Sequence, residues 1–112
     1  MEDRLMKNIG FAETLRLGEL VDYQEGRVVS RTLAQLPQVG LTLFSISRGE
    51  GISAHTSPGD ALVQILDGVA RITIGEQTFN VQQGQSIVLP SGVPHALDAD
   101  ENFKFLLTVI KP

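Results

Sequence analysis

The chain has 112 residues, which is enough for one domain with a single core and below the length at which chains usually split. Hydrophobic residues make up 42% and charged residues 20%, a composition typical of globular rather than disordered proteins. The formal net charge is −4 and the nine basic residues are scattered, which argues against a nucleic-acid partner or an anionic membrane surface.

Cysteine is absent from the chain, which excludes disulfides, thiolate ligands and cysteine nucleophiles together and fits a reducing compartment. The first residues, MEDRLMKNIGF, contain no apolar run of signal-peptide length, and no later segment approaches a membrane span. We therefore expect a cytoplasmic protein.

Residues 1–26 are expected to form an N-terminal arm with little regular structure that belongs to the same domain as the rest. The leucines and the valine between Phe11 and Tyr23 follow neither the helical nor the strand period. Gly18 counts against a long helix, so we expect coil with at most one helical turn.

Residues 27–112 are expected to form a barrel of short strands. Segments 27–34 (RVVSRTLA) and 39–47 (VGLTLFSIS) are rich in β-branched and apolar residues and are separated by a link that contains proline. Turn signals then recur mostly every seven to ten residues, as in all-β sandwiches and barrels. Asp67–Gly68 is the strongest hairpin signal, and Val69–Ile74 alternates like a strand with one wet face.

Two predicted strands, Ala61–Leu66 and Phe103–Ile110, are apolar on both faces. Such a strand must bury both faces, and a small domain with one core leaves the second face to another layer or another chain. A homodimer formed through these strands is the simplest interpretation. A second sheet packed inside the same chain is the alternative.

The two histidines of the chain, His55 and His95, lie in two similar stretches rich in glycine and proline. In GQSIVLPSGVPH (residues 84–95), Gly84 opens a short apolar strand, and Pro90 ends it because proline cannot donate to a strand ladder. His95 then enters an apolar segment, where an imidazole needs a hydrogen-bond partner. The first stretch, GEGISAHTSPGDALVQILDG, carries His55 about forty residues upstream.

These two stretches resemble the two motifs of the cupin superfamily. The first motif places a glycine, a His-x-His pair, a glutamate and a second glycine at set intervals, and here those places hold Gly49, His55, Ser57, Ala61 and Gly68. The second motif matches at every spacing from Gly84 to His95, with Ala99 where asparagine is expected. The resemblance covers Val39–Pro112. It implies an all-β fold, the cupin jelly-roll β-barrel (double-stranded β-helix, RmlC-like) of six to eight strands, with both histidines inside.

The resemblance also implies where a metal would bind. The four ligand positions of metal-binding cupins hold here His55, Ser57, Ala61 and His95. Two imidazoles are fewer than the three protein ligands a divalent ion usually has, and they leave its charge uncompensated. Asp60 would complete a site only if a slip or bulge after Pro58–Gly59 turned it inward. We therefore expect no metal. A Zn, Ni, Fe or Mn ion, if bound, would use His55 and His95, with Asp60 as a third ligand only if it faces inward.

Three functions stay open at this point. The first is a barrel that binds a small organic molecule, with a pocket lined by His55, Ser57, Ala61, Val63 and His95 and enlarged by the alanine. The second is a metal-dependent enzyme of the dioxygenase or isomerase type, in which His95 or His55 is the candidate catalytic acid or base. The third is a non-catalytic dimeric interaction protein. The sequence alone does not choose between binding and catalysis.

Overall fold

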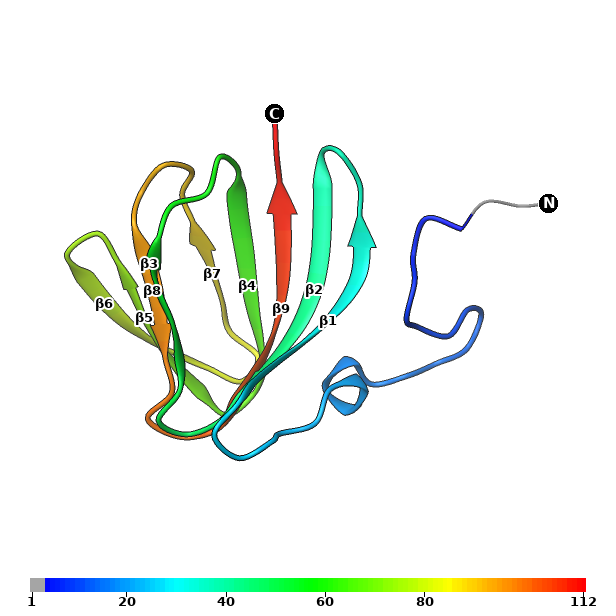
Figure 1. Cartoon of the computed structure of the whole chain (residues 1–112), viewed down its shortest axis with the longest axis horizontal. Coiled ribbons are helices and arrows are strands. Elements are labelled where there is room, and N and C mark those ends of the chain that lie inside the picture. Colours follow the sequence, from blue (N-terminus) through cyan, green and yellow to red (C-terminus); the bar gives the residue numbers. More distant parts are fainter. Residues whose placement is uncertain (1–3) are drawn as a thin grey trace.

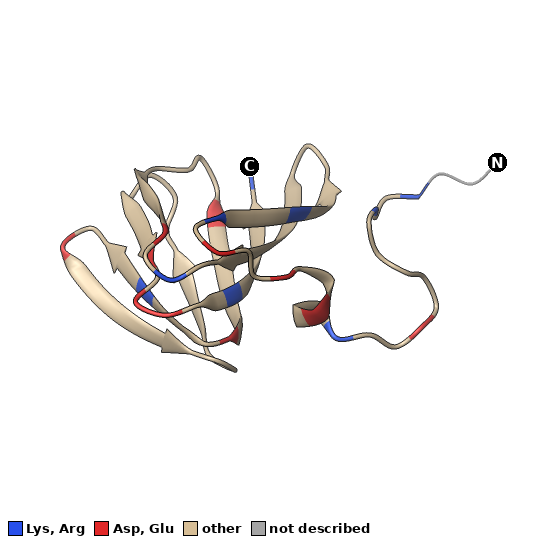
Figure 2. Cartoon of the chain, turned by 60° about the horizontal axis from the view of Figure 1, so that its bottom comes forward, with Lys and Arg blue, Asp and Glu red and all other residues tan. Residues whose placement is uncertain are grey.

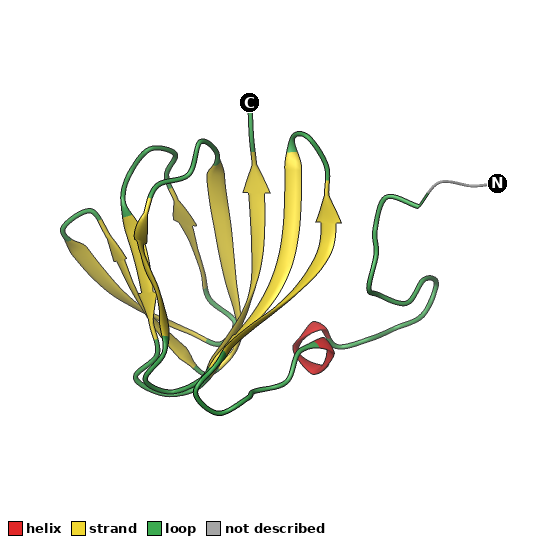
Figure 3. Cartoon of the chain, in the orientation of Figure 1, coloured by secondary structure: helices red, strands yellow, loops and turns green. Residues whose placement is uncertain are grey.

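The computed structural model describes residues 4–112, and in that range the protein is built almost entirely of β-strands (Figures 1 and 3). Within it, no helix is long and apolar enough to cross a membrane. The elements are the 3₁₀ helix η1 (Leu17–Leu20) and the strands β1 (Val28–Gln35), β2 (Val39–Ile46), β3 (Gly51–His55), β4 (Asp60–Asp67), β5 (Val69–Ile74), β6 (Gln77–Gln82), β7 (Ser86–Leu89), β8 (His95–Asp98) and β9 (Phe103–Ile110).

The strands form two antiparallel sheets that face each other. One sheet has five strands in the order β1-β2-β9-β4-β7, and the other has four in the order β3-β8-β5-β6. Consecutive strands from β2 onward often change sheet, so the chain winds around the sandwich (Figure 1). This is the jelly roll that the sequence predicts, with nine strands in the described part rather than six to eight.

The main core lies between the two sheets. It is supplied by the inward residues of strands that alternate between core and exterior. Val63 and Phe103 of the five-stranded sheet and Ile72 of the other are fully buried. Because β4 and β9 lie side by side in the larger sheet, their inner faces meet the smaller sheet directly.

The predicted strands 27–34, 39–47 and 69–74 are confirmed, but Asp67–Gly68 is not a hairpin. β4 belongs to the five-stranded sheet and β5 to the four-stranded sheet, so this turn is a corner between the sheets. Gly68 has φ +75°, and a Cβ there would clash with the carbonyl oxygen of Asn102. A corner this tight requires glycine just as a hairpin does, so the two turns look alike in sequence. A true two-residue hairpin, Gly75–Glu76, joins β5 to β6.

The described part of the arm, residues 4–26, contains η1 as its one regular element, in agreement with the single helical turn expected there. Its apolar residues pack on the outer face of the five-stranded sheet. Val21 is buried against Leu33, Leu43 and Leu106, and the partly buried residues around this outer cluster include Ile9, Leu17 and Leu20. The arm therefore forms a third layer over part of this sheet.

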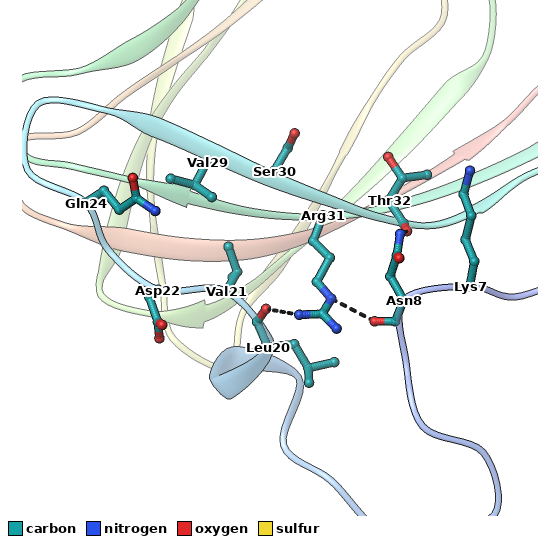
Figure 4. Close-up of a pocket in the computed structure, with 10 residues that line it drawn as sticks. All are labelled: Lys7, Asn8, Leu20, Val21, Asp22, Gln24, Val29, Ser30, Arg31 and Thr32. Carbon is teal, nitrogen blue, oxygen red and sulfur yellow. Dashed lines mark hydrogen bonds between the residues drawn. The ribbon is translucent and has the colours of Figure 1, made fainter.

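Polar side chains fasten the arm to the sheet at several points. The Arg31 side chain crosses from β1 to the arm, where its Nε donates to the carbonyl of Asn8 at 2.7 Å and its Nη1 to that of Leu20 at 3.0 Å (Figure 4). Lys104 of β9 donates to the carbonyl of Gly18 at 2.6 Å. The Tyr23 hydroxyl donates to Asp67 at 2.6 Å, and burial, together with this bond, raises the pKa of Tyr23. The second apolar face of β9 is thus covered in part by the arm of its own chain.

Candidate functional site

The two histidines meet at the end of the sandwich where β3 stops and β8 starts. His55 and His95 lie directly opposite each other in the β3–β8 ladder. Their Nε2 atoms are 3.2 Å apart, and their rings meet edge to face with centroids 4.4 Å apart. His95 is buried at 4% exposure, whereas His55 is exposed. One imidazole is therefore held in the protein interior and the other faces solvent.

A β-bulge in β3 creates this pairing. Ile52 pairs with Leu97, but the next pair is His55 with His95, so β3 contains one more residue than β8 between the two pairs. In a regular ladder Ala54 would stand opposite His95, and His55 would point to the other face. The bulge therefore decides that an imidazole, not a methyl group, faces the buried histidine.

The loops beside the two histidines are tied to each other. These loops, residues 56–59 and 90–94, lie at the upper end of the sandwich in Figure 1. The Gly92 amide donates to the carbonyl of Ser57 at 2.9 Å, and the Ser91 amide donates to the Asp60 carboxylate at 2.9 Å. These bonds hold the ends of β3 and β8 in register at the histidine pair.

The hydrogen bonds of the pair set which nitrogen of each ring carries its hydrogen. Nδ1 of His55 lies 2.8 Å from the carbonyl of Ser53, and Nδ1 of His95 lies 3.3 Å from that of Val93. A carbonyl only accepts, so each Nδ1 donates its hydrogen there. Both Nε2 atoms are then acceptors facing each other at 3.2 Å. The two Nδ1–carbonyl contacts and the Nε2–Nε2 contact need three hydrogens in all. Two neutral imidazoles carry two, and when both are on Nδ1 the Nε2–Nε2 contact has none.

At neutral pH, protonation of His95 from solution is disfavoured. Burial lowers the pKa of His95 below its ordinary 6.5, and the charge of a protonated His55 lowers it further. The bond to the Val93 carbonyl opposes these effects only in part. The pair is therefore an acceptor site that favours a donor group or a cation from outside the protein.

The other three predicted lining residues, Ser57, Ala61 and Val63, have contacts of their own. The Ser57 hydroxyl donates to the carbonyl of Gly59 at 3.2 Å and receives its amide at 3.3 Å, so it serves its own turn. Ala61 and Val63 are in the main core at 3% and 0% exposure. Of the five predicted lining residues, the structure brings the two histidines into direct contact.

Asp60 does not turn inward. The alternation of β4 sends Ala61 into the core and Asp60 to the exterior, where its carboxylate holds the Ser91 amide. The bulge that would have redirected Asp60 occurs instead in β3 and redirects His55. Among residues 4–112, no group of three or more His, Cys, Asp or Glu side chains is arranged to hold a metal ion.

Sequence reasoning missed the two carbonyls that orient the rings, those of Ser53 and Val93. Each belongs to the residue two positions before its histidine. Every residue type has a carbonyl, so no side-chain signal marks these positions.

Comparison with known protein families matches residues 42–110 to the family described as "Cupin domain". The chain belongs to the cupin family. The histidine pair stands at the positions where both cupin motifs of the sequence place a histidine, and the jelly roll is the fold that those motifs imply. Comparison with curated proteins gives no match.

Among solved structures, this cupin is similar to the conserved SPY1581 protein of unknown function from Streptococcus pyogenes, with 46% identity and a TM-score of 0.96 over 98% of this chain and 96% of that one. A cupin superfamily protein from Desulfitobacterium hafniense matches with 32% identity and a TM-score of 0.91 over 96% of this chain and 98% of that one. A cupin 2 conserved barrel domain protein from Leptotrichia buccalis matches with 43% identity and a TM-score of 0.85 over 87% of this chain and 47% of that one. The first two matches extend over nearly the whole chain, arm included.

Proposed function

We propose that this cupin binds a small organic molecule by accepting one hydrogen-bond donor of the ligand between the imidazoles of His55 and His95. The observation that carries the proposal is the approach of two Nε2 atoms to 3.2 Å, both of which are acceptors when each Nδ1 donates to its carbonyl. A ligand hydroxyl supplies a hydrogen to this contact without bringing a charge into a partly buried site.

The two histidines have different parts in this binding. His95, at 4% exposure, holds its acceptor nitrogen in surroundings poor in water, which strengthens a hydrogen bond to the ligand. His55 is exposed, so the ligand reaches the pair from its side. Two acceptors converging on one hydroxyl can also draw its proton in a reaction, which makes either histidine the candidate base if this cupin is an enzyme.

A divalent metal ion is the second candidate occupant, and the nitrogen spacing favours it. Two imidazole nitrogens that bind one tetrahedral ion at about 2.0–2.1 Å stand roughly 3.3 Å apart, close to the spacing seen here. The rest of the donor set does not fit a resident ion. The described residues add no third ligand to the pair, and two neutral imidazoles leave the ion's charge uncompensated. We therefore assign no catalytic step to a metal.

The test is a set of ligand pairs that differ only in the donor. Each hydroxyl compound is matched with its methyl ether, phenol with anisole among them, and added to ¹⁵N-labelled protein. Long-range ¹H–¹⁵N spectra report the imidazole nitrogens. We expect hydroxyl compounds, but not their ethers, to shift both Nε2 resonances, and His55→Phe to remove the effect at His95. Equal shifts from both members of every pair, or none from any, would contradict the proposal.

The metal candidate has its own readout. Equilibrium dialysis against Zn²⁺, Ni²⁺, Fe²⁺ and Mn²⁺ measures the ion bound per chain without any ligand. Binding well below one ion per chain supports the organic ligand as the occupant. One ion per chain that is lost in His95→Asn would replace the first proposal with the second.

A further inference from the structure

The interior between the two sheets is closed at one end of the sandwich and exposed at the other. At the closed end, Phe103 begins β9 and Ile46 ends β2, and both are fully buried. Farther along the inner faces of these two strands, Phe44, Leu107 and Val109 pack against the core but are only partly buried. Fraying of strand ends would expose both ends alike, so the difference between the two ends belongs to the fold. We refer to the partly buried side as the open end.

The open end is the end that carries the histidine pair. Val109 of β9 pairs with the second residue of β4, and only residues 56–59 separate the start of β4 from His55. On the other sheet, Ile74 pairs directly with His95, and it is the one inward residue of β5 that is not fully buried. Burial therefore decreases toward the imidazoles along strands of both sheets, at the upper end of the sandwich in Figure 1.

The inner faces of both sheets carry no charge along the described strands. β3, β6 and β7 contain no charged residue at any position, and charged residues of the other strands, such as Arg71, Asp98 and Lys104, point away from the core. The acidic residues of the described part lie in the arm, in turns and at strand ends (Figure 2). Thr42 and His95 are the polar residues at the inward positions of β2, β5, β8 and β9. A ligand at the open end therefore meets apolar side chains and few hydrogen-bonding groups.

We propose that the ligand of the histidine pair is an uncharged alcohol or phenol with an apolar body, which packs on the partly buried side chains of Phe44, Leu107 and Val109. This inference rests on the proposed function and adds the class of ligand to it. Facing sheets lie about 10 Å apart, so a molecule one ring wide reaches from the imidazoles to the opposite sheet. An apolar body removes the exposed inner side chains from water. A carboxylate or a sugar would lose its own water there without finding partners.

Four hydroxyl compounds test the class of ligand while the donor stays the same. Phenol and cyclohexanol have an apolar body, glycerol has a polar one, and 4-hydroxybenzoate joins an apolar ring to a negative charge. Each is titrated into ¹⁵N-labelled protein, and the shifts of both Nε2 resonances give the affinity. We expect phenol and cyclohexanol to bind at least tenfold more tightly than the other two. A smaller difference, with shifts present, overturns the class of ligand and leaves the proposed function standing. No shift from any of the four removes the proposed function and this inference with it.

Variants of the inner wall test where the body of the ligand lies. Leu107→Ser should weaken phenol binding at least fivefold. Leu62→Ser is the matched control, because Leu62 is also a partly buried leucine but lies on the outer face of the neighbouring strand, and it should leave phenol binding unchanged. Circular dichroism confirms that each variant is folded. Equal phenol affinity in the wild type and both variants overturns the proposal.

A charge at the open end should reverse the preference. Val109→Lys places an ammonium group near the end of β9, where a longer side chain has room to reach water. The variant should bind 4-hydroxybenzoate more tightly than phenol, because the carboxylate then has a partner. This result does not depend on a loss of binding, so a folding defect cannot imitate it. A folded Val109→Lys variant that keeps the wild-type order of affinities overturns the proposal.

Discussion

The two faces of the five-stranded sheet are closed by different means. The inner face meets the second sheet, and Val63 and Phe103 on it have no exposed surface. The outer face meets an arm whose one regular element is a single 3₁₀ turn, yet Leu43 beneath it is also fully buried. A segment without regular structure thus buries apolar residues as completely as a sheet does. Apolar residues on a strand face therefore indicate that the face is covered, but not which part of the molecule covers it.

The two closures differ in what holds them. Continuous ladders join the strands within each sheet, and corners join the two sheets. The described arm has no ladder and is held by apolar contacts and by separate bonds of Arg31, Lys104, Tyr23 and Asn8. Few cooperative bonds and an exposed backbone are typical of segments that open locally without global unfolding. Substitutions on the inner and outer faces, and a change of pH, separate the two kinds of closure.

Phe103→Ala should have the largest effect. The side chain is fully buried in the inner core, where it stacks on Phe105 with ring centroids 5.7 Å apart. Loss of the ring leaves a cavity between two rigid sheets, so we expect a destabilisation of about 3–5 kcal/mol. Urea unfolding followed by circular dichroism measures it. A cost near that of an exposed site, under about 1 kcal/mol, would mean that the inner core is not tightly packed.

Leu43→Ala should cost less, about 2–3 kcal/mol, although Leu43 is equally buried. Its cover is the arm, which adjusts to a smaller side chain more easily than a sheet does. The same urea experiment provides the number, with Phe103→Ala as the reference. If Leu43→Ala cost under about 1 kcal/mol, the arm would not be docked on this face in solution.

Lys104→Met should loosen the arm and leave the barrel nearly unchanged. The substitution keeps the apolar stem and removes the bond to the Gly18 carbonyl, at a cost of about 1 kcal/mol. Amide hydrogen exchange should become faster in residues 16–24 but not in β4 or β5. Lys111→Met, at an exposed lysine beyond β9, is the matched control. Uniformly faster exchange would show that the arm and barrel unfold together.

Lowering the pH should reduce the stability of the protein, with a smaller effect than the three substitutions above. His95 is the one buried titratable side chain among the described residues, and burial, with a smaller effect of His55, lowers its pKa from 6.5. The unfolded chain then takes up the proton more readily than the folded one. The stability contributed by neutral His95 is complete above pH 6.5 and is lost as the pH falls through the lowered pKa.

The melting temperature should therefore fall by a few degrees between pH 7 and pH 5, before most carboxylates titrate. Calorimetry at several pH values measures this slope. His95→Asn should flatten it, because asparagine does not titrate. A slope that is the same in the variant would assign the effect to another group.

Much of the fold could be predicted because its signals are local. β-branched runs and turn residues located β1, β2 and β5, since strand formation and turn geometry depend on neighbouring residues. Gly68 was assigned to the wrong kind of turn because its positive φ serves a hairpin and a corner equally. Which sheet the next strand joins depends on contacts far away in the sequence. Similarly, Leu17, Leu20 and Val21 follow the surface of the sheet rather than a period.

The site was predicted in part for the same reason. The spacing of the two cupin motifs predicted that His55 and His95 share one site, and the structure places their rings in contact. The bulge in β3 was not predictable, because one extra residue against the partner strand depends on how two distant segments align. The pocket expected around Ala61 was inferred from the small side chain alone. The structure places Ala61 in the main core at 3% exposure.

The orientation of both imidazoles rests on the main chain, and this has a consequence for how the protein can vary. Ser53 and Val93 hold the rings through their carbonyls, which any replacement at those positions would keep. Substitutions at Ser53 and Val93 therefore leave the orientation of both rings in place and change only the side chains beside the pair. The proposed acceptor pair can thus stay constant among related chains whose surrounding side chains differ.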